Sequence, residues 1–373
     1  MNFCPQNTNN FLLLIQSNSP GEVSNWVIPF IKRFKKSVPD SDIIVFLTPC
    51  QYSSNQEARI LSESKLVSKI VPNTESMKHI CSMPFKVKHS YKNGAVLFLG
   101  GDPLYSWILS KKYKLPCYGY SDHNKSLGWG YKKSFFKNKV GDLMSEKVNQ
   151  FLETNNTQSP KDIDILFFTG SRPQHFKAFF PIVMDTIKSL KELSPNYTIK
   201  VHISPFITDT LFNSQVKEAP TDIEFTREDA LKVMAKSKLL VTLAGTNTAE
   251  AMYLNLPMIV LFPLNFPDLV ILDGLAGIIE KIPIIGPLIK KLVLLYLRKT
   301  VKFVSHPNRL TNSEIVPEII GVIDSEVLAS KANTLLKNKN ELEKITNDLK
   351  SIPHPKNVSE TILKDITNHH RYK

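Results

Sequence analysis

A turn of small residues with an arginine, Gly170-Ser171-Arg172, follows the apolar run 163–168 and has the composition of an anion-binding turn. Glycine lets the backbone approach a ligand closely, and the planar guanidinium of arginine can pair with two phosphate oxygens. The alternative is an ordinary strand-to-helix turn with a solvated arginine, since Gly-Ser turns are common in loops. This turn by itself does not decide between the two.

A second turn of this kind, residues 244–250, follows another apolar run and has the sequence Ala-Gly-Thr-Asn-Thr-Ala-Glu. A helix that opens with Gly245, Thr246 and Thr248 leaves several N–H donors unpaired, and Glu250 can reach back to them or to a sugar hydroxyl. The alternative is a capping box without a ligand. Two such turns at the carboxyl ends of strands predict a diphosphate site for a nucleotide-linked donor.

The elements that position these turns follow from short apolar runs separated by amphipathic stretches, a pattern typical of parallel sheets covered on both faces. The expected strands are 11–15, 43–47, 69–71, 95–99 and 117–120 in the first half and 163–168, 198–203, 239–243 and 258–262 in the second. The expected helices include 182–193, 325–350 and 358–366, with a break from Pro353 to Pro355.

The polar stretch from Leu152 to Pro160 has the composition of a linker, so we place a domain boundary there. This gives domains at 1–152 and 161–350 and a C-terminal helix within 351–373. The predicted fold class is α/β, with two doubly wound domains that face each other across a substrate cleft.

Composition limits the classes of function. The chain has 373 residues, a formal net charge of +13 and four scattered cysteines without metal-ligand spacing, which fits a reducing compartment. No secretory signal pattern is present at the N-terminus, so we expect a cytoplasmic protein. The charge suggests an acidic partner: nucleic acid, an anionic membrane or a phosphate-bearing substrate. No basic run interleaved with aromatics is concentrated in one place, which argues against nucleic acid.

The stretch 264–297 is strongly apolar but is interrupted by charged residues and by Pro283 and Pro287. It therefore contains no continuous apolar span of about 20 residues, the length needed to cross a bilayer. We expect an insertion that lies in the membrane interface, with Lys290 and Lys291 meeting lipid phosphates. The alternatives are a core helix and the interface of a homodimer.

Further motifs resemble one known family. Residues 303–310, Phe-Val-Ser-His-Pro-Asn-Arg-Leu, precede Ile315-Val316-Pro317-Glu318, and Asn357-Val358-Ser359-Glu360 opens the last apolar stretch. Together with the two turns, this order resembles lipid-A-disaccharide synthases, whose pattern runs Gly-Ser-Arg, Ser-Gly-Thr-x-Thr-x-Glu, Pro-Asn and Val-Pro-Glu. The resemblance covers about half of the chain. It implies that Asn308 lies near the donor and Glu318 near its nucleoside.

The N-terminal half resembles the family in two segments. Gly21-Glu22-Val23-Ser24 is similar to the family's Gly-Glu-x-Ser-Gly-Asp, although Asn25-Trp26 replaces the final Gly-Asp. Gly100-Gly101-Asp102-Pro103 resembles the segment with the family's essential aspartate, which implies that Asp102 is the general base. The alternative for Asp102 is an Asp-Pro turn that caps the following helix. The resemblance places Gly21, Glu22 and Ser24 on the acceptor side, with Glu22 also in the catalytic set.

Other positions depart from the family pattern. Asp142 stands in a Val-Gly-Asp-Leu-Met segment where the family has Val-Gly-His-Pro-Leu, and His175 stands where the family's Gly-Ser-Arg-x-x-Glu ends in glutamate. Such departures are typical of a divergent branch, and the chain resembles the cyanobacterial-type relatives of the synthase about as well. The more ordinary interpretation of His175 is a solvated residue in a first helical turn.

The resemblance implies the GT-B arrangement of glycosyltransferases and an inverting transfer of 2,3-diacylglucosamine from UDP to 2,3-diacylglucosamine 1-phosphate, giving the lipid A disaccharide. It implies no metal and no cofactor besides the UDP-sugar donor, because positive charge and helix dipoles can stabilise the leaving diphosphate. It also implies a peripheral location on the cytoplasmic face of the inner membrane. The alternatives are transfer of a different UDP-sugar to another lipid or glycan, and a non-catalytic membrane- or nucleotide-binding protein.

Overall fold

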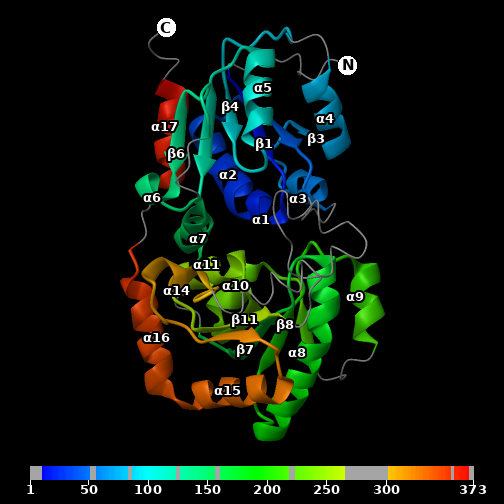
Figure 1. The fold of residues 1–373 in the computed structure, drawn as a ribbon, viewed down its shortest axis with the longest axis vertical. Helices are drawn as coiled ribbons and strands as arrows, with labels where there is room; N and C mark the ends of the chain where they lie inside the picture. Colours follow the sequence, from blue (N-terminus) through cyan, green and yellow to red (C-terminus); the bar gives the residue numbers. More distant parts are fainter. Residues whose placement is uncertain are drawn as a thin grey trace. The chain divides into compact units, whose positions relative to one another are not determined.

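The chain forms two compact units in a computed structural model (Figure 1), each built around a six-stranded parallel sheet. The structure describes residues 11–50, 56–82, 86–122, 127–155, 160–217, 223–264, 301–353 and 357–368. Unit 1 contains Met1–Thr154 and His354–Lys373, and unit 2 contains Asn155–Pro353. The expected apolar insertion lies outside the described residues from residue 265 onward.

The sheet of unit 1 has the strand order β3-β2-β1-β4-β5-β6, with every pair parallel. Its strands are β1 (Phe11–Ser17), β2 (Ser41–Leu47), β3 (Lys69–Val71), β4 (Asn93–Phe98), β5 (Cys117–Ser121) and β6 (Lys133–Phe136). All residues of β1 and β2 are buried, because parallel strands connected through helices are covered on both faces.

Helices of unit 1 cover this sheet. They are α1 (Pro20–Glu22), α2 (Ile28–Ser37), α3 (Glu57–Glu63), α4 (Asn73–Cys81), α5 (Pro103–Tyr113), α6 (Lys137–Val140), α7 (Leu143–Thr154) and α17 (Val358–Asn368). A π-helical segment, η1 (Val23–Val27), joins α1 to α2. Such segments are rare and often mark functional positions, and this one lies in the Gly21 to Trp26 motif.

The sheet of unit 2 repeats the arrangement, with the order β12-β11-β10-β7-β8-β9. Its strands are β7 (Ile163–Phe168), β8 (Ile199–His202), β9 (Glu224–Thr226), β10 (Ser237–Leu243), β11 (Met258–Pro263) and β12 (Glu318–Gly321). Counted from its own first strand, each sheet has the order 3-2-1-4-5-6 of a Rossmann-like domain. The predicted pair of doubly wound α/β domains is confirmed.

The helices of unit 2 are α8 (Pro173–Leu193), α9 (Asp209–Val216), α10 (Ala230–Ala235), α11 (Thr246–Tyr253), α14 (His306–Thr311), α15 (Ser325–Lys337) and α16 (Lys339–Ser351). The long helix α8 and the C-terminal α15 pack against each other (Figure 1). Asp324 caps α15 by accepting hydrogen bonds from two N–H groups of its first turn, and Asn338 caps α16 by accepting one, from the Glu341 N–H.

Every strand expected from the sequence is present, with ends shifted by at most two residues. The strands β6, β9 and β12 were not expected, because each has three or four residues and is at least partly exposed, which leaves little hydrophobic pattern. The predicted linker is wrong at its start: Leu152 to Thr154 form the last turn of α7. Their polar composition reflects an exposed helix end.

The C-terminal helix α17 returns to unit 1 and packs on α2 and α7. Arg33 of α2 connects these helices, because its guanidinium pairs with Glu146 at 2.9 Å, Glu153 at 3.3 Å and Glu360 at 3.8 Å. The Glu146 carboxylate is buried and raises the pKa of Arg33 against the opposing effect of burial. The charged network therefore fixes the chain's last helix to its first domain.

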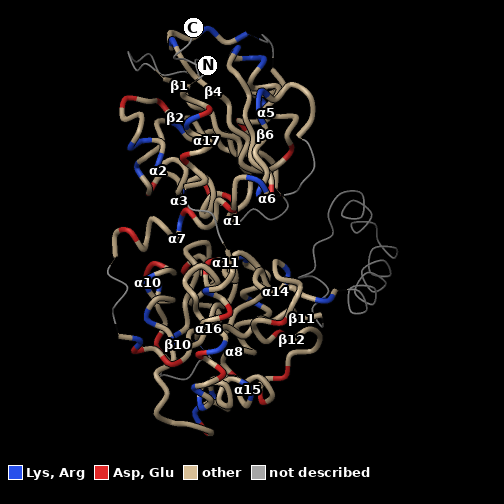
Figure 2. Tube along the Cα trace, turned by 90° about the vertical axis from the view of Figure 1, so that its left-hand side faces the viewer, with Lys and Arg blue, Asp and Glu red and all other residues tan. Residues whose placement is uncertain are grey.

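Basic and acidic residues are distributed over the described parts of both units (Figure 2). Among the described helices, none combines the length and the apolar character required to cross a bilayer.

Replacing Arg33 with methionine should lower the free energy of unfolding by about 3 kcal/mol, because Glu146 would remain buried without its partner. Arg59→Met is the matched control, since Arg59 forms an exposed pair with Glu63 one helical turn away and should change stability by less than about 0.5 kcal/mol. Denaturant unfolding monitored by circular dichroism measures both. Equal effects of the two variants would contradict a structural role for the Arg33 network.

Candidate active site

Both units carry their candidate residues at the position where the strand order of the sheet reverses. In unit 1 the chain leaves β1 and β4 through the segments with Glu22 and Asp102, and β1 and β4 are neighbours. In unit 2 it leaves β7 and β10 through the turns 170–172 and 244–250, and these strands are also neighbours. Ligands of open α/β sheets bind outside the carboxyl ends of strands at such reversals. Topology therefore supports both sets of predicted residues.

Glu22 is held by a capping box at the start of α1. The Ser19 hydroxyl accepts a hydrogen bond from the Glu22 N–H at 3.3 Å, and Glu22 Oε2 accepts one from the Ser19 N–H at 3.1 Å. The side chain is therefore fixed by its own turn, with Pro20 as the first helical residue.

The Glu22 carboxylate lies directly against the backbone of Gly100. Gly100 has φ +127°, and a Cβ at this position would be 2.1 Å from Oε2 of Glu22. Any other residue would both strain the backbone and displace the carboxylate. This contact between Glu22 and Gly100 joins the two predicted motifs of unit 1, Gly21 to Ser24 and Gly100 to Asp102.

Burial raises the pKa of Glu22 from 4.5 to about 7, which is the largest effect on this group. The hydrogen bonds from Ser19 act in the opposite direction, and the nearby charge of Asp122 adds to the increase. A carboxyl group with a pKa near the working pH can accept a proton and release it again, as a general base must.

Asp102 is the N-cap of α5. Its Oδ1 accepts a hydrogen bond from the Leu104 N–H at 2.9 Å, and the side chain is exposed at the carboxyl end of β4. The capping alternative is therefore observed. A cap that is also exposed at this edge can still meet a substrate, so the catalytic role of Asp102 stays a prediction.

Gln16, at the end of β1, holds this loop and was missed by the sequence analysis. Its buried Nε2 donates to the carbonyl oxygens of Gly100 and Asp102, each at 3.0 Å, and its Oε1 accepts from the Ser106 hydroxyl of α5. A glutamine at the end of an otherwise apolar strand was the available signal. Asp122, which follows the adjacent strand β5, was also missed because the Tyr-Ser-Asp segment has no distinctive motif.

Asn25 and Trp26, which replace the Gly-Asp of the family pattern, lie in the interior of unit 1. Both residues are buried in η1. Asn25 Oδ1 accepts from Lys147 Nζ at 3.1 Å, and the Trp26 ring meets Tyr120 edge-on at 5.4 Å. These side chains therefore pack within unit 1, and Gly21, Glu22 and Ser24 are the half-buried members of this segment.

In unit 2 the turn after β7 lies beside the end of β10. Gly170 has φ +93°, and a Cβ there would be 3.3 Å from the Leu243 side chain, which precedes the second turn. Ser171 follows, and Arg172 is the N-cap of α8 but makes no side-chain capping bond. The structure thus brings the two predicted anion-binding turns together.

The second turn leaves helix α11 open at its N-terminus. Its N-cap is the exposed Gly245, which has no side chain to cap the helix, so the capping-box alternative is not observed. Within the described part of the chain, the N–H groups of Thr246 and Asn247 have no acceptor. Glu250 is buried within α11. Free N–H donors at a helix start are the groups that bind phosphate oxygens.

Thr248 connects this turn to the next motif. Its hydroxyl donates to the Gly245 carbonyl at 2.7 Å and accepts from the His306 N–H at 3.0 Å, which joins α11 to the start of α14. The threonine therefore positions both the helix opening and the His306-Pro307-Asn308 segment.

Asn308 and Glu318 form the polar centre of that segment. The Asn308 amide donates to the Val316 carbonyl and to Glu318 Oε1, both at 2.8 Å, and its Oδ1 accepts from the N–H groups of Ile315 and Val316. These four bonds use the full capacity of the side chain. Glu318 also accepts from the N–H groups of residues 304 and 305. Both residues fix the loop that follows Thr248.

Comparison with known proteins identifies the family. The family model for lipid-A-disaccharide synthetase matches residues 131–359, more than half of the chain. The chain belongs to the lipid-A-disaccharide synthetase family. A curated lipid-A-disaccharide synthase from Geobacter sulfurreducens is 22% identical over 131 residues, and this match covers 34% of each chain. The matched part of the chain thus covers about a third of that relative's length.

Solved structures share the fold of this family member. The S. aureus MnaA–UDP co-structure matches with TM-score 0.57 and 12% identity over 98% of both chains. The UDP-GlcNAc 2-epimerase from Neisseria meningitidis bound to UDP-GlcNAc matches with TM-score 0.53 and 12% identity over 96% of this chain and 100% of its own. At this identity the likeness shows the two-domain fold alone. Among the described residues of the synthetase-family chain, no group of three or more His, Cys, Asp or Glu side chains is arranged to hold a metal ion.

Asn308→Ala should lower the free energy of unfolding by about 3 kcal/mol, because the buried N–H and carbonyl groups of Val316 and the half-buried N–H of Ile315 would lose the side-chain partner that they have in the structure. Asn338→Ala is the control, since Asn338 is an exposed helix cap and its loss should cost about 1 kcal/mol. Denaturant unfolding of the two variants gives the comparison. A cost for Asn308→Ala no greater than for Asn338→Ala would show that the loop does not depend on this amide.

Glu22→Gln should change how stability depends on pH. The folded-state pKa of about 7 exceeds the unfolded value of 4.5, so the glutamate's contribution is full below pH 4.5 and is lost as the pH rises through 7. The glutamine has no such loss. Between pH 4 and pH 8 we therefore expect the free energy of unfolding of the variant to rise by roughly 2 kcal/mol relative to that of the wild type. Denaturant unfolding of both proteins at pH 4, 6 and 8 measures this. The same dependence of the free energy of unfolding on pH in both proteins would exclude the raised pKa.

Proposed function

We propose that the protein is an inverting glycosyltransferase that moves a sugar from a UDP-linked donor to a lipid acceptor. The observation that carries this proposal is the open N-terminus of α11 beside the Gly170-Ser171-Arg172 turn, in a chain of the lipid-A-disaccharide synthetase family. The finer proposal is transfer of 2,3-diacylglucosamine from UDP to 2,3-diacylglucosamine 1-phosphate, giving the lipid A disaccharide.

The donor's diphosphate would bind at the carboxyl edge of the sheet in unit 2. The N–H groups of Thr246 and Asn247 and the positive end of the α11 dipole would stabilise the negative charge that develops on the leaving UDP, together with Arg172. This arrangement requires no metal and no further cofactor. Two structures of the same fold hold UDP or UDP-GlcNAc, which supports UDP as the first nucleotide to test.

The acceptor chemistry would take place at the carboxyl edge of the sheet in unit 1. The acceptor hydroxyl gives its proton to a carboxylate and attacks the anomeric carbon, while the bond from that carbon to the UDP oxygen breaks. Asp102 and Glu22 are the two candidates for the proton acceptor. Glu22 has the pKa suited to this task, and Asp102 has the greater exposure.

An apolar surface begins at the same edge and supports an acylated acceptor. Leu104, two residues after Asp102, is 52% exposed, and Trp129 is 89% exposed with its ring 6.2 Å from that of Trp107. Lys111 lies over Trp107 at 5.9 Å. An exposed tryptophan with a lysine nearby is typical of surfaces that contact acyl chains and anionic headgroups. This surface supports a peripheral location on the cytoplasmic face of the inner membrane.

The proposed reaction is tested by release of UDP from UDP-2,3-diacylglucosamine in the presence of 2,3-diacylglucosamine 1-phosphate and detergent. We expect turnover with this pair and none when the acceptor is omitted. Release of UDP with another UDP-sugar and acceptor, but not with this pair, would support a glycosyltransferase with different substrates and would contradict the lipid A reaction. Absence of release across a panel of UDP-sugars, with UDP still bound, would favour a non-catalytic nucleotide-binding protein.

The same assay separates the two carboxylates. Asp102→Asn keeps the helix cap and should abolish turnover while UDP binding is retained, if Asp102 accepts the proton. Glu22→Gln keeps the acceptor oxygen for the Ser19 N–H, and it should abolish the rise of kcat/KM through pH 7 if Glu22 is the base. Turnover retained in one variant removes that residue from the proton transfer.

A further inference from the structure

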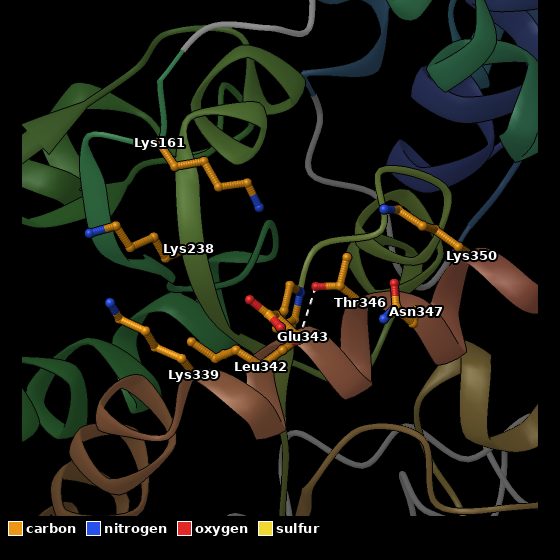
Figure 3. A pocket seen from close by; sticks show the side chains of 9 residues that line it. Lys161, Lys238, Lys339, Leu342, Glu343, Thr346, Asn347 and Lys350 are labelled. Carbon is orange, nitrogen blue, oxygen red and sulfur yellow. Dashed lines mark hydrogen bonds between the residues drawn. The ribbon is translucent and has the colours of Figure 1, made fainter.

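Unit 2 contains a pocket at the amino edge of its sheet, where no predicted site residue lies. Its volume is about 560 Å³, within the range of small-ligand sites, and Figure 3 shows its lining. One wall is the face of α16 from Lys339 to Lys350. The other wall comes from Lys161, Lys238 and Pro257, which lie at the starts of β7, β10 and β11.

Positive charge dominates this pocket. Lys161 and Lys350 enter from opposite sides and point toward each other (Figure 3). Neither of them, nor Lys339, makes an ion pair with another residue in the described ranges, whereas Lys238 pairs with Asp164 at 2.7 Å. Glu343 is the only carboxylate in the lining. Within the described ranges, three lysine ammonium groups therefore share this lining with one carboxylate and are not ion-paired.

The interaction between these lysines is unfavourable in the absence of a ligand. Burial lowers the pKa of Lys161, and the charge of Lys350 lowers it further. Both side chains are exposed, so solvent weakens their repulsion, and an anion between them would be attracted to both. Asn347 adds an amide to the same lining.

This pocket is separate from the proposed donor site. The turns 170–172 and 244–250 follow the carboxyl ends of β7 and β10, whereas the pocket lies at their amino ends. The seven residues of β10 separate the two edges by roughly 20 Å. A diphosphate at α11 would therefore leave these lysines uncompensated.

We propose that the pocket is a second anion site, which takes a phosphate or diphosphate group between Lys161 and Lys350, with Lys339 at its rim. The ammonium groups of Lys161 and Lys350, which point toward each other (Figure 3), suit the several oxygens of a phosphate group, to which lysine binds as a point charge. The site joins two distant segments, because Lys161 follows the first passage of the chain between the units, at Thr154–Asn155, and Lys350 precedes the second, at Pro353–His354. The phosphate can belong to a free small molecule or to a lipid headgroup.

The test is titration of the full-length protein with pyrophosphate by calorimetry, without UDP, because the diphosphate of UDP would compete for the same lysines. The double variant Lys161→Gln/Lys350→Gln should weaken pyrophosphate binding at least about tenfold, because two charge-assisted contacts are lost. The matched control is Lys337→Gln/Lys344→Gln, which removes the same charge from exposed positions on α15 and α16 that do not line the pocket. The control should bind within about twofold of wild type.

The comparison is between two double variants, so it does not require that UDP binds at the donor turns or that the protein transfers sugar. Equal pyrophosphate affinity in wild type and both double variants, or equal losses in both, would overturn the proposal. Co-sedimentation with vesicles of neutral lipid, with and without anionic phospholipid, distinguishes the sources. Selective loss of anionic vesicle binding in Lys161→Gln/Lys350→Gln identifies a headgroup, and unchanged vesicle binding with lost pyrophosphate affinity identifies a free phosphate compound.

Discussion

The rest of the structure depends on the burial of two parallel sheets on both faces. Strands such as β1 and β2 have no exposed residue, so the few polar side chains within them, such as Gln16 and Asp42, are buried and the exposed polar groups lie in the segments that follow the strands. Because all strands of a sheet run in the same direction, the segments that leave them gather at one edge. This is why Glu22 and Asp102, 80 positions apart in the chain, belong to one loop cluster.

In both units a buried amide holds that cluster in place. Gln16 binds the carbonyl groups of Gly100 and Asp102, and Asn308 binds the backbone of residues 315 and 316 together with Glu318. A buried amide must satisfy its donors and its acceptor, so it tolerates few arrangements of the loops around it. The N–H groups at the start of α11 can then remain open without loss of order.

The two edges of the sheet in unit 2 differ in the groups that supply positive charge. At the carboxyl edge, positive potential comes mainly from backbone N–H groups and one arginine, whose positions are fixed by the fold. At the amino edge it comes from lysine side chains that repel one another in a pocket. A preorganised site suits a reacting group whose charge must be stabilised at a defined point, whereas flexible lysines suit an anion that is bound without reaction.

The sequence by itself determined the fold class and the identity of most candidate residues, because buried strands are continuous apolar runs and glycine-containing turns follow them directly. It could not reveal the short strands β6, β9 and β12 or the return of α17 to unit 1, which depend on pairing with distant segments. Only the tertiary structure decided the state of Glu22, since its pKa is set by burial against Gly100, and only it gathered Lys161 and Lys350 into one pocket. Desolvation and like-charge repulsion are properties of groups in space, and local sequence does not encode them.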